Sequence, residues 1–291
     1  MVLFGNCQVK ALWHVFNKYL SKEWKCRYIC NYKLIADKEK SYPADLFVAG
    51  NCDVLVYQPL ARDRQPDLCT EDLVAKLPVD TIKLSFPYLF FFGYHPDYVK
   101  GDDPKLPYLH DAVTKTCREL SKETECKFET TPELDLVIAE LGKIDLFDCF
   151  YMDGRMLYSM NEMRAREQHP DSGATSLKIV DFIEAQFRNQ LLFYTINHPT
   201  LIMIQHIVNQ ITNILKLPLL VLNSEEDDLL RFDTICPIFD CVTKHHQLQF
   251  TFDNQQLRVN RQIYDFRQYV ELHVKYWSSL PSSCVVKRTA Q

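Results

Sequence analysis

The sequence predicts an α/β fold: a central, mostly parallel sheet of about five short strands flanked by many helices, with a largely helical C-terminal extension. Apolar runs of strand length alternate with longer stretches in which apolar residues recur at helical spacing. Strands separated by helices are typical of parallel sheets with crossover connections. The 291 residues can bury a large core. We expect an α/β domain over residues 1–222, and an extension over residues 223–291 packed on the same domain.

The chain begins with a strand, a tight turn and a helix. Residues 2–4 are apolar, Gly5 and Asn6 form a turn signal, and helical periodicity then continues to about residue 21. Asn6, Cys7 and Gln8 therefore fall at the junction. In open α/β sheets, ligands bind outside the carboxyl ends of the strands. The nearby helix N-terminus also favours a thiolate or a bound anion.

The same reasoning assigns the remaining elements in order. Further strands are expected at residues 25–34, 53–58 and 81–85, and the run 191–196 is either the last strand of the sheet or an extended stretch beside it. A short connection is expected at residues 45–51. Helices are expected at residues 108–121, 132–141, 150–168, 177–190, 201–217 and 263–277. The acidic run 225–228 is expected to be a solvated loop or a helix start, and the polar tail after residue 277 is expected to fray.

Composition excludes several classes of protein. The net charge of −5 argues against a nucleic-acid partner, although a local basic pocket remains compatible with it. The longest apolar run, near residues 86–92, is far shorter than the ~20 residues of a membrane span. Eleven cysteines without a Cys-x-x-Cys pattern, and no signal-peptide pattern, indicate a soluble, cytoplasmic protein with free thiols. The oligomeric state stays open.

Cys7 and His198 are the candidate catalytic residues. Cys7 is either a nucleophile or ligand-contacting thiol at the edge of the sheet, or a small buried hydrophobic residue, as most free cysteines are. His198 follows a predicted strand and precedes a helix, which would bring it to the same edge. Alternatively, the turn around His198 only starts the helix after Pro199.

Three other sets of polar residues are candidates for a functional site. His95 lies in a turn and either lines a cleft or faces solvent. Gln58 ends a strand and either donates to a carbonyl or oxyanion, or is simply a polar strand end. His245 and His246 have no further ligand nearby in the sequence, so no metal is expected.

Four short motifs resemble those of the WcbI-type polysaccharide-biosynthesis family over about residues 1–222. They are Gly5-Asn6-Cys7-Gln8, residues 53–59, residues 93–97 and Asn197-His198-Pro199-Thr200. The resemblance implies a coenzyme A (CoA)-binding protein, an acetyltransferase acting on capsule sugars, with a sheet related to the SGNH-hydrolase type. In that type a nucleophile follows the first strand and a histidine comes late in the chain, the positions of Cys7 and His198 here.

The resemblance also implies the chemistry. Acetyl-CoA would be the acyl donor and a carbohydrate hydroxyl the acceptor, with His198 acting as general base either on Cys7 or directly on the acceptor. The residues expected to bind substrate or stabilise the oxyanion are Gly5, Asn6, Gln8, Gln58, His95 and Asn197. An esterase or thioesterase on the same framework, and a non-catalytic protein that binds CoA or a glycan, remain as alternatives.

Overall fold

The computed structural model describes residues 1–36, 52–63, 69–101, 103, 105–124, 130–168, 170–171, 173–223 and 225–279. They divide into two compact units, each formed by two stretches of chain. Unit 1 comprises Met1–Phe90 and Tyr158–Arg231, and unit 2 comprises Phe91–Leu157 and the chain from Phe232 onward. The expected connection at residues 45–51 and the tail after residue 279 lie outside the described residues.

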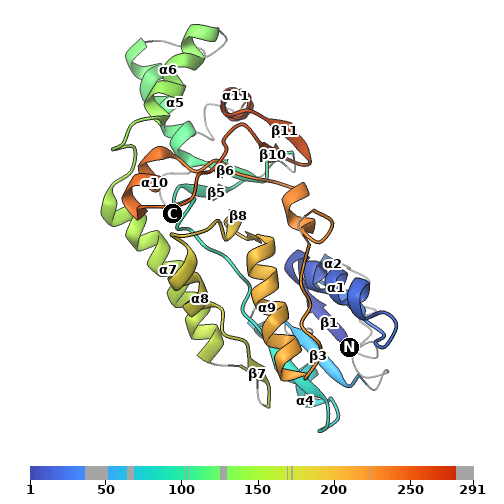
Figure 1. The fold of residues 1–291 in the computed structure, drawn as a ribbon. Coiled ribbons are helices and arrows are strands. Elements are labelled where there is room, and N and C mark those ends of the chain that lie inside the picture. Colours follow the sequence, from blue (N-terminus) through green and yellow to red (C-terminus); the bar gives the residue numbers. More distant parts are fainter. Residues whose placement is uncertain are drawn as a thin grey trace. The chain divides into compact units, whose positions relative to one another are not determined.

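Unit 1 is built on the parallel sheet that the sequence predicts (Figure 1). The strand order is β2-β1-β3-β4-β7, and every neighbouring pair is parallel. The strands are β1 (Val2–Gly5), β2 (Arg27–Cys30), β3 (Val54–Tyr57), β4 (Ile82–Ser85) and β7 (Thr175–Ser176). Because the strands are parallel, the residues that follow β1, β3 and β4 meet at one edge of the sheet.

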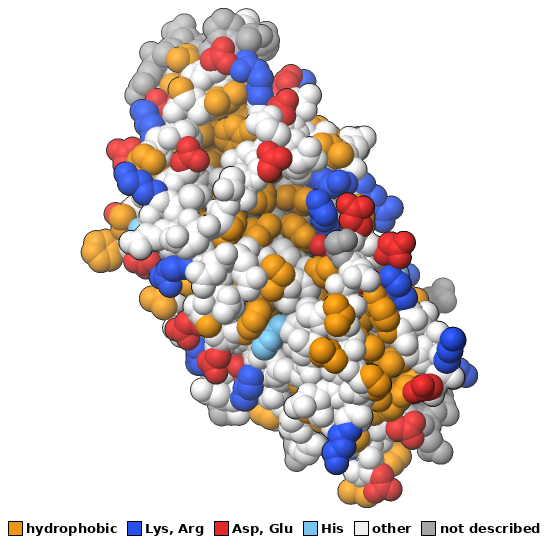
Figure 2. All heavy atoms as spheres, in the orientation of Figure 1, with side chains coloured by type: hydrophobic (Ala, Val, Ile, Leu, Met, Phe, Trp, Pro, Cys, Tyr) orange, Lys and Arg blue, Asp and Glu red, His pale blue; other side chains and the backbone are white. Residues whose placement is uncertain are grey.

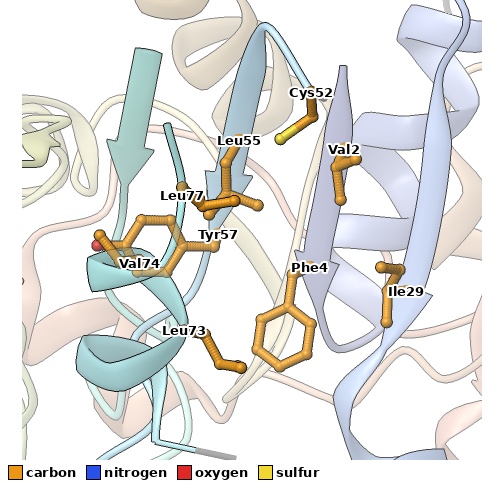
Figure 3. Close-up of a cluster of buried hydrophobic side chains, with 9 residues drawn as sticks. All are labelled: Val2, Phe4, Ile29, Cys52, Leu55, Tyr57, Leu73, Val74 and Leu77. Atoms are coloured by element: carbon orange, nitrogen blue, oxygen red, sulfur yellow. The ribbon is translucent and has the colours of Figure 1, made fainter. Parts of the chain in front are cut away.

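The helices of unit 1 are α1 (Cys7–Leu20), α2 (Asn31–Ala36), α4 (Thr70–Ala75), the second half of α7 (Cys149–Gln168), α8 (Val180–Gln186) and α9 (Leu201–Ile214). Val2 and Phe4 point to one face, where they pack with Tyr57 and with Leu73 of α4 (Figure 3). Leu3, between them, is fully buried on the other face because side chains alternate along a strand. The helix α1 packs on β1 and also contacts α9.

Two expected strands differ from the structure. The second strand ends at Cys30, and the residues after it form α2. The run 191–196 contributes β8 (Phe193–Thr195), which pairs antiparallel with β9 (His198–Pro199) outside the central sheet. The fifth strand is instead β7, whose two residues are too few to show any periodicity.

The acidic run 225–228 was expected to be a solvated loop or a helix start: its first two residues are exposed and the run directly precedes a 3-10 helix, but Asp227 and Asp228 are buried. The Asp227 side chain is fully buried: Lys18 Nζ lies 2.9 Å from its Oδ1, and the Tyr19 hydroxyl donates to its Oδ2 over 2.8 Å. Burial raises the pKa of Asp227, but the hydrogen bonds from Lys18 and Tyr19 outweigh this and lower it. The following 3-10 helix, η2, spans Leu229–Phe232.

Unit 2 combines two hairpin-like strand pairs with helices. Its elements are β5 (Tyr98–Lys100), β6 (Tyr108–His110), α5 (Asp111–Thr124), α6 (Thr131–Leu141), the first half of α7, α10 (Asp240–His246), β10 (Leu257–Val259), β11 (Gln262–Tyr264) and α11 (Phe266–Ser278). Residues 108–110, expected to start a helix, pair with β5 instead, and residue 263 lies in β11 rather than in the last helix. The helix α11 packs on α5 and α6, so the end of the chain groups with residues 91–157 and not with the parallel sheet. Within the described residues, no helix combines the length and apolarity needed to cross a bilayer.

Candidate functional site

The turn after β1 places Cys7 at the start of α1. Gly5 has φ +156°, and a Cβ atom there would lie 2.5 Å from Val9 Cγ2 and 2.7 Å from Gln58 Oε1. The backbone therefore approaches its neighbours as only glycine allows. Asn6 caps the helix, because its Oδ1 accepts a hydrogen bond from Gln8 N over 2.8 Å. Cys7 is the first helical residue and is half-buried.

Gln8 joins three distant segments. Its side chain is fully buried and makes four hydrogen bonds. Nε2 donates to Leu89 O over 2.7 Å and to Asn197 O over 2.8 Å. Oε1 accepts from Leu89 N over 3.0 Å and from Gln58 Nε2 over 2.6 Å. The residue after Cys7 is thus bonded to the residue before His198.

Gln58 is engaged with the protein itself. It follows β3, its Oε1 accepts from Asn6 N over 3.2 Å, and its Nε2 donates to Gln8. Its side-chain amide is therefore committed at both atoms to holding the turn. The geometry gives Gln58 and Gln8 positioning roles more readily than direct contact with a substrate.

The second half of the site is the turn between β8 and β9. The Thr195 hydroxyl accepts from His198 N over 3.1 Å and from Asn197 N over 3.3 Å, and donates to Asn197 Oδ1 over 3.2 Å. The segment is fixed by these bonds and by the Gln8 bond to Asn197. His198 is largely buried, at 5% exposure. Four sequence-predicted residues, Asn6, Gln8, Gln58 and Asn197, therefore form one hydrogen-bonded network, which we call the Gln8 network. Gly5, Cys7 and His198 are chain neighbours of its members.

Two tyrosines belong to this network and were not expected from the sequence. The Tyr88 hydroxyl accepts from Asn197 Nδ2 over 2.5 Å, and Tyr28 donates to Asn6 O over 3.0 Å. Burial is the main cause of the raised pKa of Tyr88, and the Asn197 amide, which donates to the hydroxyl oxygen, lowers the pKa by a smaller amount. The one available signal was position, because Tyr88 comes just after β4, at the same sheet edge.

His95 lies in unit 2, in a cluster of its own. It is buried, and its Nδ1 lies 3.2 Å from Pro237 O. Burial, aided by the charge of His110, lowers the pKa of His95 to about 3, so it is neutral. Burial also lowers the pKa of His110, but Asp97, at 2.9 Å, outweighs this and raises it to about 10. His95 thus belongs to unit 2, whereas the residues around Gln8 belong to unit 1.

Comparison with known proteins places the chain in a family. A model described as "Polysaccharide biosynthesis enzyme WcbI" matches residues 1–220. The chain belongs to the WcbI family. No curated protein matches the chain. A solved structure described as WcbI, a novel polysaccharide biosynthesis enzyme, matches with a TM-score of 0.75 and 19% identity, over 98% of this chain and 91% of that one. That structure is further described as the native protein without a disulfide bond between CoA and one of its cysteines.

Membership of the WcbI family indicates that the chain is an enzyme of polysaccharide biosynthesis. The match to the solved structure shows that the two chains share a fold. The matched residues 1–220 contain every member of the Gln8 network.

The surface drawn in Figure 2 carries acidic and basic side chains interspersed, in keeping with the net charge of −5.

Proposed function

We propose that this chain transfers an acyl group, acetyl in the simplest case, from a CoA thioester to a carbohydrate hydroxyl, using Cys7 and His198. The observation that carries the proposal is the Gln8 side chain, which bonds the Cys7 turn to the Asn197 carbonyl over 2.8 Å. Two further facts support it: the family is one of polysaccharide biosynthesis, and a structural relative is described with CoA and a cysteine.

In the covalent route the acyl group passes from CoA to Cys7 and then to the acceptor. The Cys7 thiolate attacks the thioester carbonyl, the carbon–sulfur bond to CoA breaks, and the leaving CoA sulfur takes a proton from protonated His198, so that CoA departs as a thiol and His198 becomes neutral. The acceptor hydroxyl then attacks the acyl-Cys7 carbonyl while His198 accepts its proton, and Cys7 is released as thiolate. The N-terminus of α1 favours the thiolate form of Cys7.

Two more side chains have proposed roles. The Tyr88 hydroxyl oxygen accepts a hydrogen bond from Asn197, so the Tyr88 hydroxyl proton does not point toward Asn197. This proton can be donated to the thioester oxygen. The Arg166 guanidinium carbon lies 5.5 Å from the centroid of the Phe90 ring, and its Nη2 lies 3.2 Å from Glu162 Oε2. The positive charge of Arg166 lowers the pKa of Tyr88, although burial raises that pKa by more. The Arg166 guanidinium is suited to hold a CoA phosphate.

A labelling experiment tests whether CoA reaches Cys7. The full chain is treated with CoA disulfide, and the modified cysteine is located by peptide mass mapping. Binding-directed exchange attaches CoA to Cys7 in preference to Cys149, which is exposed and serves as the internal control. Reaction at Cys149 with Cys7 unmodified would refute CoA binding at this turn.

A kinetic experiment tests the transfer itself. CoA release from acetyl-CoA is followed with and without a panel of sugars, for wild type, Cys7→Ala, His198→Gln and the control Cys149→Ala. We expect acceptor-dependent release, a loss of about 10²-fold or more for His198→Gln, and one acetyl group on Cys7 in the mass spectrum when no acceptor is present.

The alternatives give different results. Steady CoA release without any sugar identifies a thioesterase. Transfer that survives in Cys7→Ala but not in His198→Gln identifies direct attack by the acceptor. CoA binding without release in any variant identifies a non-catalytic protein, and overturns the proposal.

A further inference from the structure

Two adjacent histidines in unit 2 lie beside a carboxylate from a distant part of the chain. His245 and His246 end α10, and Asp153 lies in the first turns of α7. His245 Nε2 is 2.7 Å from Asp153 Oδ1, although the two residues are 92 apart in sequence. One ligand atom from each of the three residues lies within 4.8 Å of the others. No metal was expected from the sequence, because no third ligand stands near the histidine pair along the chain.

The three donors suit a divalent transition-metal cation. Two imidazoles and one carboxylate form a donor set used for zinc and other first-row metals. Metal–ligand distances of about 2.0–2.2 Å in tetrahedral sites place ligand atoms about 3.4 Å apart, so small side-chain movements from the observed spacing suffice. The His245 and His246 rings have centroids 4.7 Å apart and planes at 67°, which lets one nitrogen of each ring approach a common point.

The exposure of the three side chains and their place at a helix C-terminus are both compatible with a bound cation. His246 is buried and the His245 side chain is 18% exposed, whereas the Asp153 side chain is 49% exposed. The site is thus closed on the protein side and reachable from solvent, which leaves a position for water or another ligand. It also lies at the C-terminal end of α10, where backbone carbonyl groups favour positive charge.

We propose that Asp153, His245 and His246 form a divalent transition-metal site, with Zn²⁺ as the probe. The alternative is a simple His245–Asp153 ion pair, which does not need His246. A metal would tie α7 to α10, elements from the two separate stretches of unit 2, and would stabilise the folded chain by mass action. This proposal is independent of acyl transfer.

The test uses the full chain after treatment with EDTA. Titration with Zn²⁺ is followed by calorimetry and thermal unfolding, for wild type, Asp153→Asn, His245→Gln and His246→Gln. We expect one bound ion, a rise in melting temperature for wild type, and affinity at least about tenfold weaker in each variant. Asp240→Asn is the matched control, since this exposed carboxylate sits at the opposite end of α10 and should bind as wild type does.

Two further measurements, an absorption spectrum with Co²⁺ and the melting temperatures of the metal-free variants, distinguish this site from adventitious metal binding. Loading with Co²⁺ should give an absorption spectrum free of thiolate-to-cobalt charge transfer, because the ligands are nitrogen and oxygen and not any of the eleven cysteines. His246 is buried, so the apo melting temperature of each variant is compared with wild type, and the half-exposed Asp153→Asn keeps the test valid if His246→Gln is unstable. Equal Zn²⁺ affinity in wild type and Asp153→Asn, or a thiolate spectrum, overturns the proposal.

Discussion

Replacing Gln8 by leucine should destabilise the protein far more than an ordinary surface substitution. The change keeps the approximate size of the side chain and removes both of its polar atoms. Four partners then lose a hydrogen bond: the Leu89 N–H, the Leu89 carbonyl, the Asn197 carbonyl and the Gln58 amide. All of them lie at the sheet edge that we propose as the active site.

The size of the effect follows from these four groups. A buried polar group left without a partner costs about 1–3 kcal/mol. Taking the low end for each gives about 4 kcal/mol, which is exceptional for a single substitution. Gln58→Leu should cost less, about 1–2 kcal/mol, because Gln8 Oε1 keeps its bond from Leu89 N and the main loss is the bond from Asn6 N.

Urea unfolding measures both variants through the midpoint and the slope of the transition. Gln256→Leu, at an exposed position, is the control and should change stability by no more than about 0.5 kcal/mol. The double variant of Gln8 and Gln58 should cost less than the sum of the single variants, because one bond joins the two side chains. A cost below about 1 kcal/mol for Gln8→Leu would refute the view that this side chain holds the site together.

Two further perturbations test the turn and the buried cluster. Gly5→Ala should cost about 1–3 kcal/mol in urea unfolding, because the added methyl group meets Val9 Cγ2 at 2.5 Å and Gln58 Oε1 at 2.7 Å; unchanged stability would show that the turn can relax. The Asp97–His110 pair should stabilise unit 2 below pH 6.5, and this contribution should fade as the pH rises through the folded pKa of about 10, since the folded state holds a proton on His110 that the unfolded state releases. It should also fade in acid as Asp97, whose pKa is lowered, takes up a proton. Asp97→Asn should flatten the dependence of unfolding free energy on pH between 6.5 and 10, and an equally steep dependence in the variant would exclude this pair as its source.

The fold class and the first site residues were predictable because their signals are local. Three apolar residues, a glycine turn and a helical repeat within the first twenty residues fix β1, the turn and α1. The order of strand and helix then predicts a parallel sheet, and with it the edge where Cys7 lies.

The elements that were missed depend on pairing partners. Residues 108–110 read as part of a helix, yet they form β6 because β5 supplies the opposite strand. Thr175 and Ser176 show no strand pattern, and they become a strand only by lying beside β4. Asp227 was expected in a solvated loop or at a helix start. Its side chain is buried, because Lys18 pairs with its carboxylate and Tyr19 donates a hydrogen bond to it.

The sequence by itself determined the α/β class, the strand–turn–helix start and the types of residue at the sheet edge, because each rests on spacing within a few turns of chain. Only the tertiary structure decided that Gln8 bonds to Asn197, 189 residues later, and that Asp153 lies against His245. Such contacts depend on the path of the whole chain, since a polar side chain takes the partners that folding brings to it once water is excluded.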